Sequence, residues 1–306
     1  MSRRTLAARA AVTVALLALV AVRLDPAALL GRLVALSVPW VGLALALQFG
    51  GVAASSLAWG ALLAPFARTG ALGRRRLFRW YLVSRFVNLA GPGTVLGDAT
   101  RVVQTRSAGG SRAAPVAAVL AEKALYVAGF VGVASLAALG APRGPAVTTL
   151  RAVLVAVAAI GLAVGAVLAV VARAGRGRLG DATRTVLSTY RRRPGALVRG
   201  GLGTLAVVAA TVLSTWALVR AAGAVVPFTY LWVAVPLVAV AVALPVSIQG
   251  VGVRETGYVV LLGAVGVPAE TAVAVSVASF ALSVVVSLSG GALYLRAPDR
   301  RPWRGT

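Results

Sequence analysis

Long apolar runs follow one another along the whole chain, and they restrict its fold more than any other feature. An α-helix rises 1.5 Å per residue, so about 20 apolar residues cross the roughly 30 Å hydrocarbon core of a bilayer. Hydrophobic residues form 59% of the 306 residues. We therefore expect an all-α, polytopic transmembrane helical bundle, with 1–306 as a single membrane domain. The apolar runs lie at 8–22, 36–64, 80–97, 113–140, 151–172, 200–221, 229–247, 256–268 and 270–295.

The composition excludes several classes of function. The chain has 31 Lys+Arg against 7 Asp+Glu, and it contains neither Cys nor His. In a soluble protein such a charge would indicate nucleic-acid binding, but here the arginines gather between apolar runs, where they set topology and contact anionic head groups. Without Cys and His there is no disulfide framework, thiol nucleophile or His-based zinc site. We expect no cofactor, no metal, no catalytic residue and no nucleic-acid partner.

The arginine distribution predicts the topology. The positive-inside rule places arginine-rich connections in the cytoplasm, so both termini are expected to be cytoplasmic in a multi-pass protein of the cell membrane. The arginine-rich segments are 1–9, 65–79, 173–199 and 296–306. This arrangement predicts re-entrant segments at about 80–112, entering from the cytoplasm, and 229–268, entering from the outside. The six full spans are then 8–22, 36–64, 113–140, 151–172, 200–221 and 270–295. The alternative is eight full spans.

The same arrangement divides the chain into two similar halves, 1–140 and 150–296. Each half contains two spans, a re-entrant segment and a third span, and the two halves have opposite orientations. This order is typical of an inverted-topology repeat.

Two short segments, 88–98 and 245–255, interrupt their apolar surroundings in the same way. Each contains Pro and two or three Gly and ends in a carboxylate. Helix breakers and acids are costly in lipid unless protein, water or ligand satisfies them. A helix N-terminus beside such a break suits a phosphate or another anion. We predict that the two interruptions together form a polar substrate site. A tight loop at the membrane surface is the alternative for either one alone.

The candidate substrate-binding residues come from these interruptions and from a charged pair inside the run 113–140. The bases available within the apolar runs are Arg85, Arg101, Lys123 and Arg254, and internal ion pairing is the alternative role for any of these charges. Asn88 and Gln249 hold equivalent places beside the two breaks. The candidate residues are Asn88, Pro92, Gly93, Gly97, Asp98, Arg101, Glu122, Lys123, Ser247, Gln249, Gly250, Gly252, Arg254 and Glu255.

At these segments the chain resembles the lysylphosphatidylglycerol synthase transmembrane-domain family, also described as flippase-like membrane proteins. The first motif of that family is similar to N-x-x-x-P-G-x-x-G-G-D-x-x-R, and the second to P-x-S-x-x-G-x-G-x-R-E. Here they read Asn88, Pro92, Gly93, Gly97, Asp98 and Arg101, and then Pro245, Ser247, Gly250, Gly252, Arg254 and Glu255. Leu96 stands where a second Gly is usual, and Glu122-Lys123 resembles a charged pair of the family. The similarity covers roughly 35–295.

The resemblance implies a membrane protein that moves or handles lipid. The synthases add a cytosolic aminoacyl-transferase domain that 1–306 does not contain, so we do not expect aminoacylation. The leading hypothesis is a lipid translocase for a phosphate-bearing head group, either an anionic phospholipid or a lipid-linked precursor, with Arg101 and Arg254 as anion partners. The alternatives are a secondary transporter of a small solute or ion, and an accessory subunit or enzyme of lipid modification that acts with a separate enzyme partner.

Overall fold

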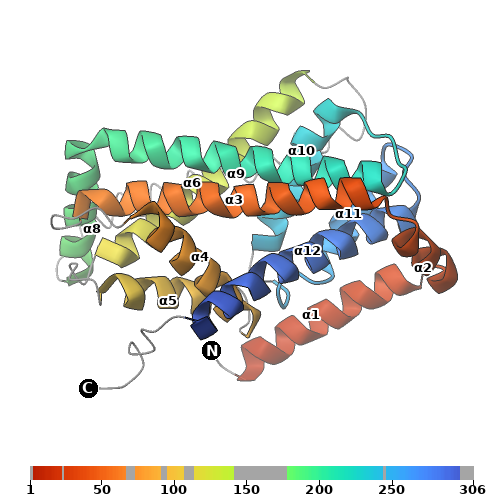
Figure 1. Cartoon of the computed structure of the whole chain (residues 1–306), viewed down its shortest axis with the longest axis horizontal. Helices are drawn as coiled ribbons and strands as arrows, with labels where there is room; N and C mark the ends of the chain where they lie inside the picture. The colour runs from red at the N-terminus through yellow and green to blue at the C-terminus, as the bar shows by residue number, and fades with distance from the viewer. Residues whose placement is uncertain are drawn as a thin grey trace.

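The computed structural model describes residues 3–22, 24–66, 73–90, 95–106, 114–140, 178–243 and 246–296, and within these ranges it contains helices and no strand (Figure 1). This confirms the predicted all-α fold. The elements are α1 (Arg3–Ala21), α2 (Pro26–Val34), α3 (Val38–Leu63), η1 (Ala64–Phe66), α4 (Arg74–Leu89), α5 (Val95–Arg106), α6 (Ala114–Gly140), α8 (Arg178–Arg192), α9 (Pro194–Ala221), α10 (Phe228–Ala243), α11 (Val253–Gly263) and α12 (Ala269–Arg296). The predicted span 151–172 lies outside the described residues.

Four helices of the described residues are long and apolar enough to cross a membrane. They are Val38–Phe66, Pro115–Leu139, Pro194–Ala221 and Ala269–Arg296. They coincide with four of the predicted spans, and shorter apolar helices occur at Arg9–Val20 and Phe228–Ala243. The chain is therefore a helical membrane protein. The number of full spans and the inverted orientation of the halves stay predictions.

Two pairs of short helices flank the interruptions. α4 has 16 residues and α5 has 12, while α10 has 16 and α11 has 11. The longest of these is about 24 Å at 1.5 Å per residue, which is less than the hydrocarbon thickness. In both halves a long helix is followed by such a pair and then by another long helix, which is the order that the predicted repeat requires.

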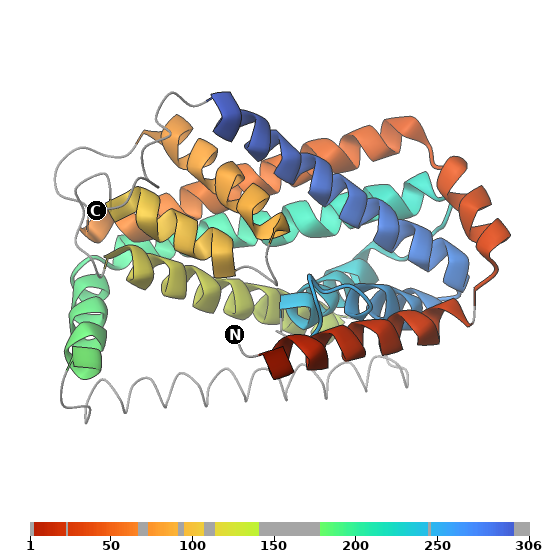
Figure 2. The same cartoon turned by 90° about the horizontal axis from the view of Figure 1, so that it is seen from below.

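Close contacts between glycines and neighbouring helices hold the long helices together. α3 and α9 lie side by side along the molecule (Figures 1 and 2). A Cβ on Gly203 of α9 would come within 2.7 Å of the Cβ of Ala58 on α3. A Cβ on Gly290 of α12 would overlap the backbone carbonyl of Leu82 on α4. Lipid provides no hydrophobic drive for helix association, so this close van der Waals packing is a main source of the bundle's stability.

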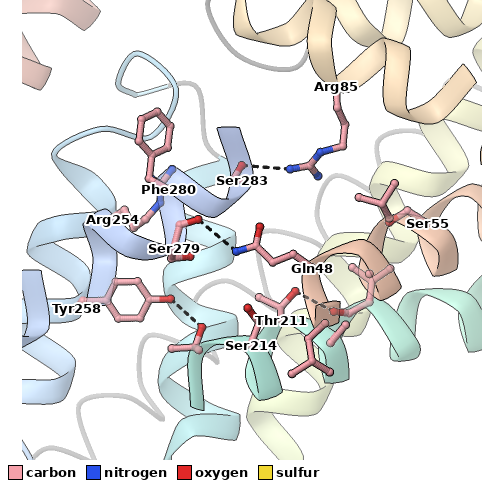
Figure 3. A pocket seen from close by; sticks show the side chains of 16 residues that line it. Gln48, Ser55, Arg85, Thr211, Ser214, Arg254, Tyr258, Ser279, Phe280 and Ser283 are labelled. Carbon is pink, nitrogen blue, oxygen red and sulfur yellow. Dashed lines mark hydrogen bonds between the residues drawn. The ribbon is translucent and has the colours of Figure 1, made fainter. Parts of the chain in front are cut away.

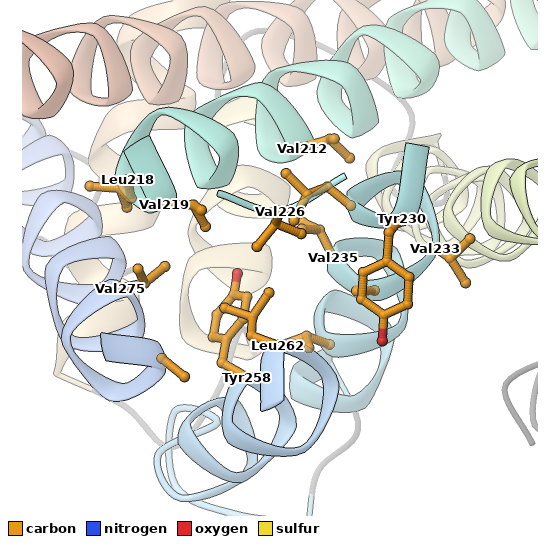
Figure 4. Close-up of a cluster of buried hydrophobic side chains, with 14 of the residues drawn as sticks. Val212, Leu218, Val219, Val226, Tyr230, Val233, Val235, Tyr258, Leu262 and Val275 are labelled. Carbon is orange, nitrogen blue, oxygen red and sulfur yellow. The ribbon is translucent and has the colours of Figure 1, made fainter. Parts of the chain in front are cut away.

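The largest apolar core lies among α6, α9, α10, α11 and α12 and includes part of α3 (Figure 4). Leu218, Leu231 and Leu262 are fully buried in it. The hydroxyls of two buried tyrosines in this core have hydrogen-bond partners. The Tyr230 hydroxyl donates to the carbonyl of Leu261 at 2.8 Å, and the Tyr258 hydroxyl lies 3.2 Å from that of Thr215. This core fixes α11, and with it the second interruption, against α10 and α12.

Candidate functional site

The two interruptions contact each other directly. The side-chain amide of Gln249 donates to the backbone carbonyl of Asn88 at 2.6 Å, although 161 residues separate the two. The side chain of Asn88 in turn accepts from the backbone N–H of Gly97 at 2.6 Å. Asn88 therefore closes the first interruption on itself and also binds the second one. The two interruptions are therefore in contact at these two residues, while a substrate site formed jointly by them stays a prediction.

Glycine is required where the first interruption closes. A Cβ on Gly97 would overlap both the side chain of Asn88 and the carbonyl of Ser84, so α5 can pack this tightly against α4 only with glycine at that position. Pro92 and Gly93 lie outside the described residues.

The charged residues of the first interruption form a self-neutralising cluster. Arg101 is 3% exposed and binds Asp98 and Glu122 at 2.5 Å each. Lys123 lies 3.2 Å from the second carboxylate oxygen of Asp98. Tyr81 donates to Glu122 at 2.9 Å, and the Arg101 guanidinium lies 4.7 Å from the centre of the Tyr81 ring. Two acids and two bases thus join α5 to α6, and Tyr81 connects α4 to them. The described partners of Arg101 are carboxylates and aromatic rings.

The acid of the second interruption stabilises the start of a helix. Glu255 is buried, and its carboxylate accepts from the N–H of Gly252 at 2.6 Å and from the hydroxyl of Ser276 at 2.9 Å. Glu255, the third residue of α11, thus satisfies the backbone N–H of Gly252, the residue that precedes the helix. The turn before it runs through left-handed backbone, with φ of 72° at Gly250 and 85° at Gly252. Ser247 is buried in the same turn.

A polar cavity of about 200 Å³ lies beside this second interruption, enclosed by α3, α4, α9, α11 and α12 (Figure 3). Eight of its lining residues carry hydroxyl or amide groups, and two are arginines. Its polar lining residues are Gln48, Ser55, Arg85, Thr211, Ser214, Thr215, Arg254, Tyr258, Ser279 and Ser283. Among the described residues, neither Asp, Glu nor Lys lines it.

Arg85 and Arg254 approach the cavity from different helices (Figure 3). Arg85 donates to the hydroxyl of Ser283 at 3.2 Å, and Arg254 donates to the carbonyl of Gln249 at 3.2 Å. Within the part of the chain that the structure describes, neither has a carboxylate within 4.0 Å. The Nε of Arg85 and one terminal nitrogen of Arg254 are buried without a hydrogen-bond acceptor. Both side chains are partly buried, and the Arg254 guanidinium also lies 4.9 Å from the centre of the Phe280 ring. An anion in the cavity would supply the counter-ion that neither guanidinium has among the described residues.

The structure distributes the predicted residues over three places. Arg254 lines the cavity, Asn88 and Gln249 join the interruptions, and the other charged candidates lie in the ion cluster or at the α11 cap. Sequence reasoning did not place Arg85 in the site, although an arginine inside an apolar run was a signal for it. The lining serines of α12 gave no such signal, because serine at helical spacing in a membrane helix is equally typical of close packing.

Comparison with known proteins gives one match. The chain matches the family described as lysylphosphatidylglycerol synthase TM region over residues 6–290. No curated protein matches it.

Proposed function

Because the chain belongs to the lysylphosphatidylglycerol synthase TM region family, we propose that this membrane protein translocates a lipid with a phosphate-bearing head group. The observation that carries the proposal is the cavity between Arg85 and Arg254, which places two uncompensated guanidinium groups among helices long enough to cross a bilayer. Guanidinium groups suit phosphate because their planar donors match its oxygens.

The cavity is connected to both interruptions by one series of hydrogen bonds. Arg254 binds the carbonyl of Gln249, and the side chain of Gln249 binds the carbonyl of Asn88. A phosphate that draws Arg254 into the cavity changes the first bond and thereby biases the second. Binding of the head group would in this way favour one arrangement of the two interruptions over another, which is the requirement for alternating access.

The remaining parts of the proposal follow from the sequence. The protein lies in the cell membrane with both termini in the cytoplasm, and its ligands are anionic phospholipids or lipid-linked precursors. The sequence contains no nucleotide-binding motif, so translocation is driven by a gradient or by mass action.

The test is lipid translocation by the purified full chain in vesicles of phosphatidylcholine with a trace of fluorescent phosphatidylglycerol. We expect the double variant Arg85→Gln/Arg254→Gln to lower the translocation rate at least tenfold, because it removes both cations from the cavity. Arg220→Gln is the matched control, since Arg220 is exposed at the end of α9 and does not line the cavity. Equal rates for the wild type and the double variant would reject the proposal.

A transporter of a small soluble anion is the second candidate. The volume of about 200 Å³ favours it, because pockets for drug-sized ligands occupy roughly 300–1,000 Å³. Uptake of inorganic phosphate into the same vesicles, without any movement of lipid, would support this candidate over the first.

A further inference from the structure

All the charged residues that line the cavity, among those the structure describes, are positive. Its lining contains two arginines, and in the described part of the chain it contains neither carboxylate nor lysine. The other polar lining groups are hydroxyls and the amide of Gln48. Hydroxyls and amides can accept hydrogen bonds from an ammonium group, but they carry no negative charge to offset its repulsion by two guanidinium groups.

The acids of the two interruptions are engaged elsewhere. Asp98 and Glu122 bind Arg101 at 2.5 Å each. Glu255 accepts from the N–H of Gly252 and from Ser276. None of the three lines the cavity, so none is in place to receive a cationic head group.

The size and hydroxyl content of the cavity also restrict the ligand. A volume of about 200 Å³ holds a head group but not the acyl chains. Ser279, Ser283 and Tyr258 line the cavity from α11 and α12 (Figure 3). The Ser283 hydroxyl accepts from Arg85 and keeps its proton for a ligand oxygen, and a hydroxyl can accept a second hydrogen bond from a ligand hydroxyl. In a phosphate joined to a short polyol, the phosphate matches the arginines and the polyol matches the lining hydroxyls.

We infer that the lipid has a small, net anionic head group, a phosphate bearing hydroxyls and carrying no ammonium group. This inference rests on the proposed function and makes it more specific. The site then selects against aminoacylated and choline lipids, including the lysyl lipid after which the family is named, because their ammonium groups would lie against Arg85 and Arg254.

The first experiment measures binding to the purified full chain in an uncharged detergent, by the shift of its unfolding temperature during titration. The probes are short-chain phosphatidylglycerol, phosphatidylcholine and lysylphosphatidylglycerol of equal chain length, together with glycerol phosphate. We expect phosphatidylglycerol to bind at least tenfold more tightly than the other three. Equal or tighter binding of the lysyl lipid overturns the charge selection, and equal binding of glycerol phosphate overturns the assignment to a lipid.

The second experiment places an acid in the cavity. Gln48→Glu keeps the side-chain shape and offsets one arginine charge, so we expect it to weaken phosphatidylglycerol binding at least tenfold and to reduce the preference over the lysyl lipid. Gln104→Glu is the matched control, because Gln104 lies on α5 and does not line the cavity. If Gln48→Glu does not fold, Ser55→Asp makes the same change from the same helix. Unchanged selectivity in the folded variant contradicts the inference.

The two proposals fail in different ways. Selective binding in detergent without translocation in vesicles would reject the translocase and keep the anionic site. Translocation of all three lipids at equal rates would keep the translocase and reject the charge selection.

Discussion

At the scale of single residues, the structure separates two kinds of arginine: Arg101 is buried, whereas Arg85 and Arg254 are partly buried. Arg101 is bound by Asp98 and Glu122, whereas Arg85 and Arg254 face a cavity and have no described carboxylate partner. The first kind stabilises the contact between helices, and under the proposed function the second kind binds the ligand. Counting charges in the sequence cannot distinguish them, because the distinction depends on which helix supplies the acid.

Removing one acid of the ion cluster should destabilise the protein. Glu122→Gln leaves Arg101 with one carboxylate in a buried site, and we expect a loss of about 3–5 kcal/mol in the free energy of unfolding, as for other broken buried pairs. Denaturant unfolding in detergent measures it. Glu270→Gln, in the first turn of α12, removes only a favourable helix-dipole contact and should cost about 1 kcal/mol or less. Equal stability of the two variants would show that the cluster contributes nothing to packing.

At the scale of elements, the interrupted helix pairs are held by different means. α4 and α5 are joined where Gly97 packs against Asn88, and the ion cluster ties α5 to α6. By contrast, α10 and α11 are joined by the apolar core. α4 also packs tightly against the C-terminal part of α12, at Gly290. The pair α4 and α5 therefore makes polar contacts with α6 and close backbone contact with α12.

The contact between α4 and α12 gives a direct test of close packing. Gly290→Ala places a methyl group on the carbonyl of Leu82, so we expect a loss of about 1–3 kcal/mol from overpacking. Gly132→Ala in α6 is the matched control, because a Cβ there has no neighbour within 4 Å and alanine favours the helix by about 1 kcal/mol. Thermal unfolding in detergent compares them. A Gly290→Ala protein as stable as Gly132→Ala would contradict this account of the helix contact.

At the scale of the whole molecule, the sequence predicted the helical bundle and the four long apolar helices, because these depend on the length of apolar runs alone. It also predicted that the two interruptions lie together, which Asn88 and Gln249 show. It did not predict the cavity, because Gln48, Arg85, Tyr258 and the serines of α12 come from separate helices and share no local motif. Such a site arises only when packing brings polar positions of several apolar helices to one place.

The predicted topology can be tested with single cysteines, since the natural chain contains none. Ser188 of α8 and Val225, after the other end of α9, are both exposed. We expect Val225→Cys to react with a membrane-impermeant maleimide in intact cells, and Ser188→Cys to react only after permeabilisation. Labelling of both residues from the same side would reject the assigned orientation of α9.

The turn at Gln249 has a consequence for motion. This residue has a φ of 56°, which costs a non-glycine residue of order 1–3 kcal/mol, and its side chain holds the carbonyl of Asn88. The tip of the second interruption therefore combines an unfavourable backbone conformation with a hydrogen bond to the first interruption. If the two tips separate during the proposed alternating access, a return of Gln249 to negative φ would offset part of the cost of breaking this hydrogen bond.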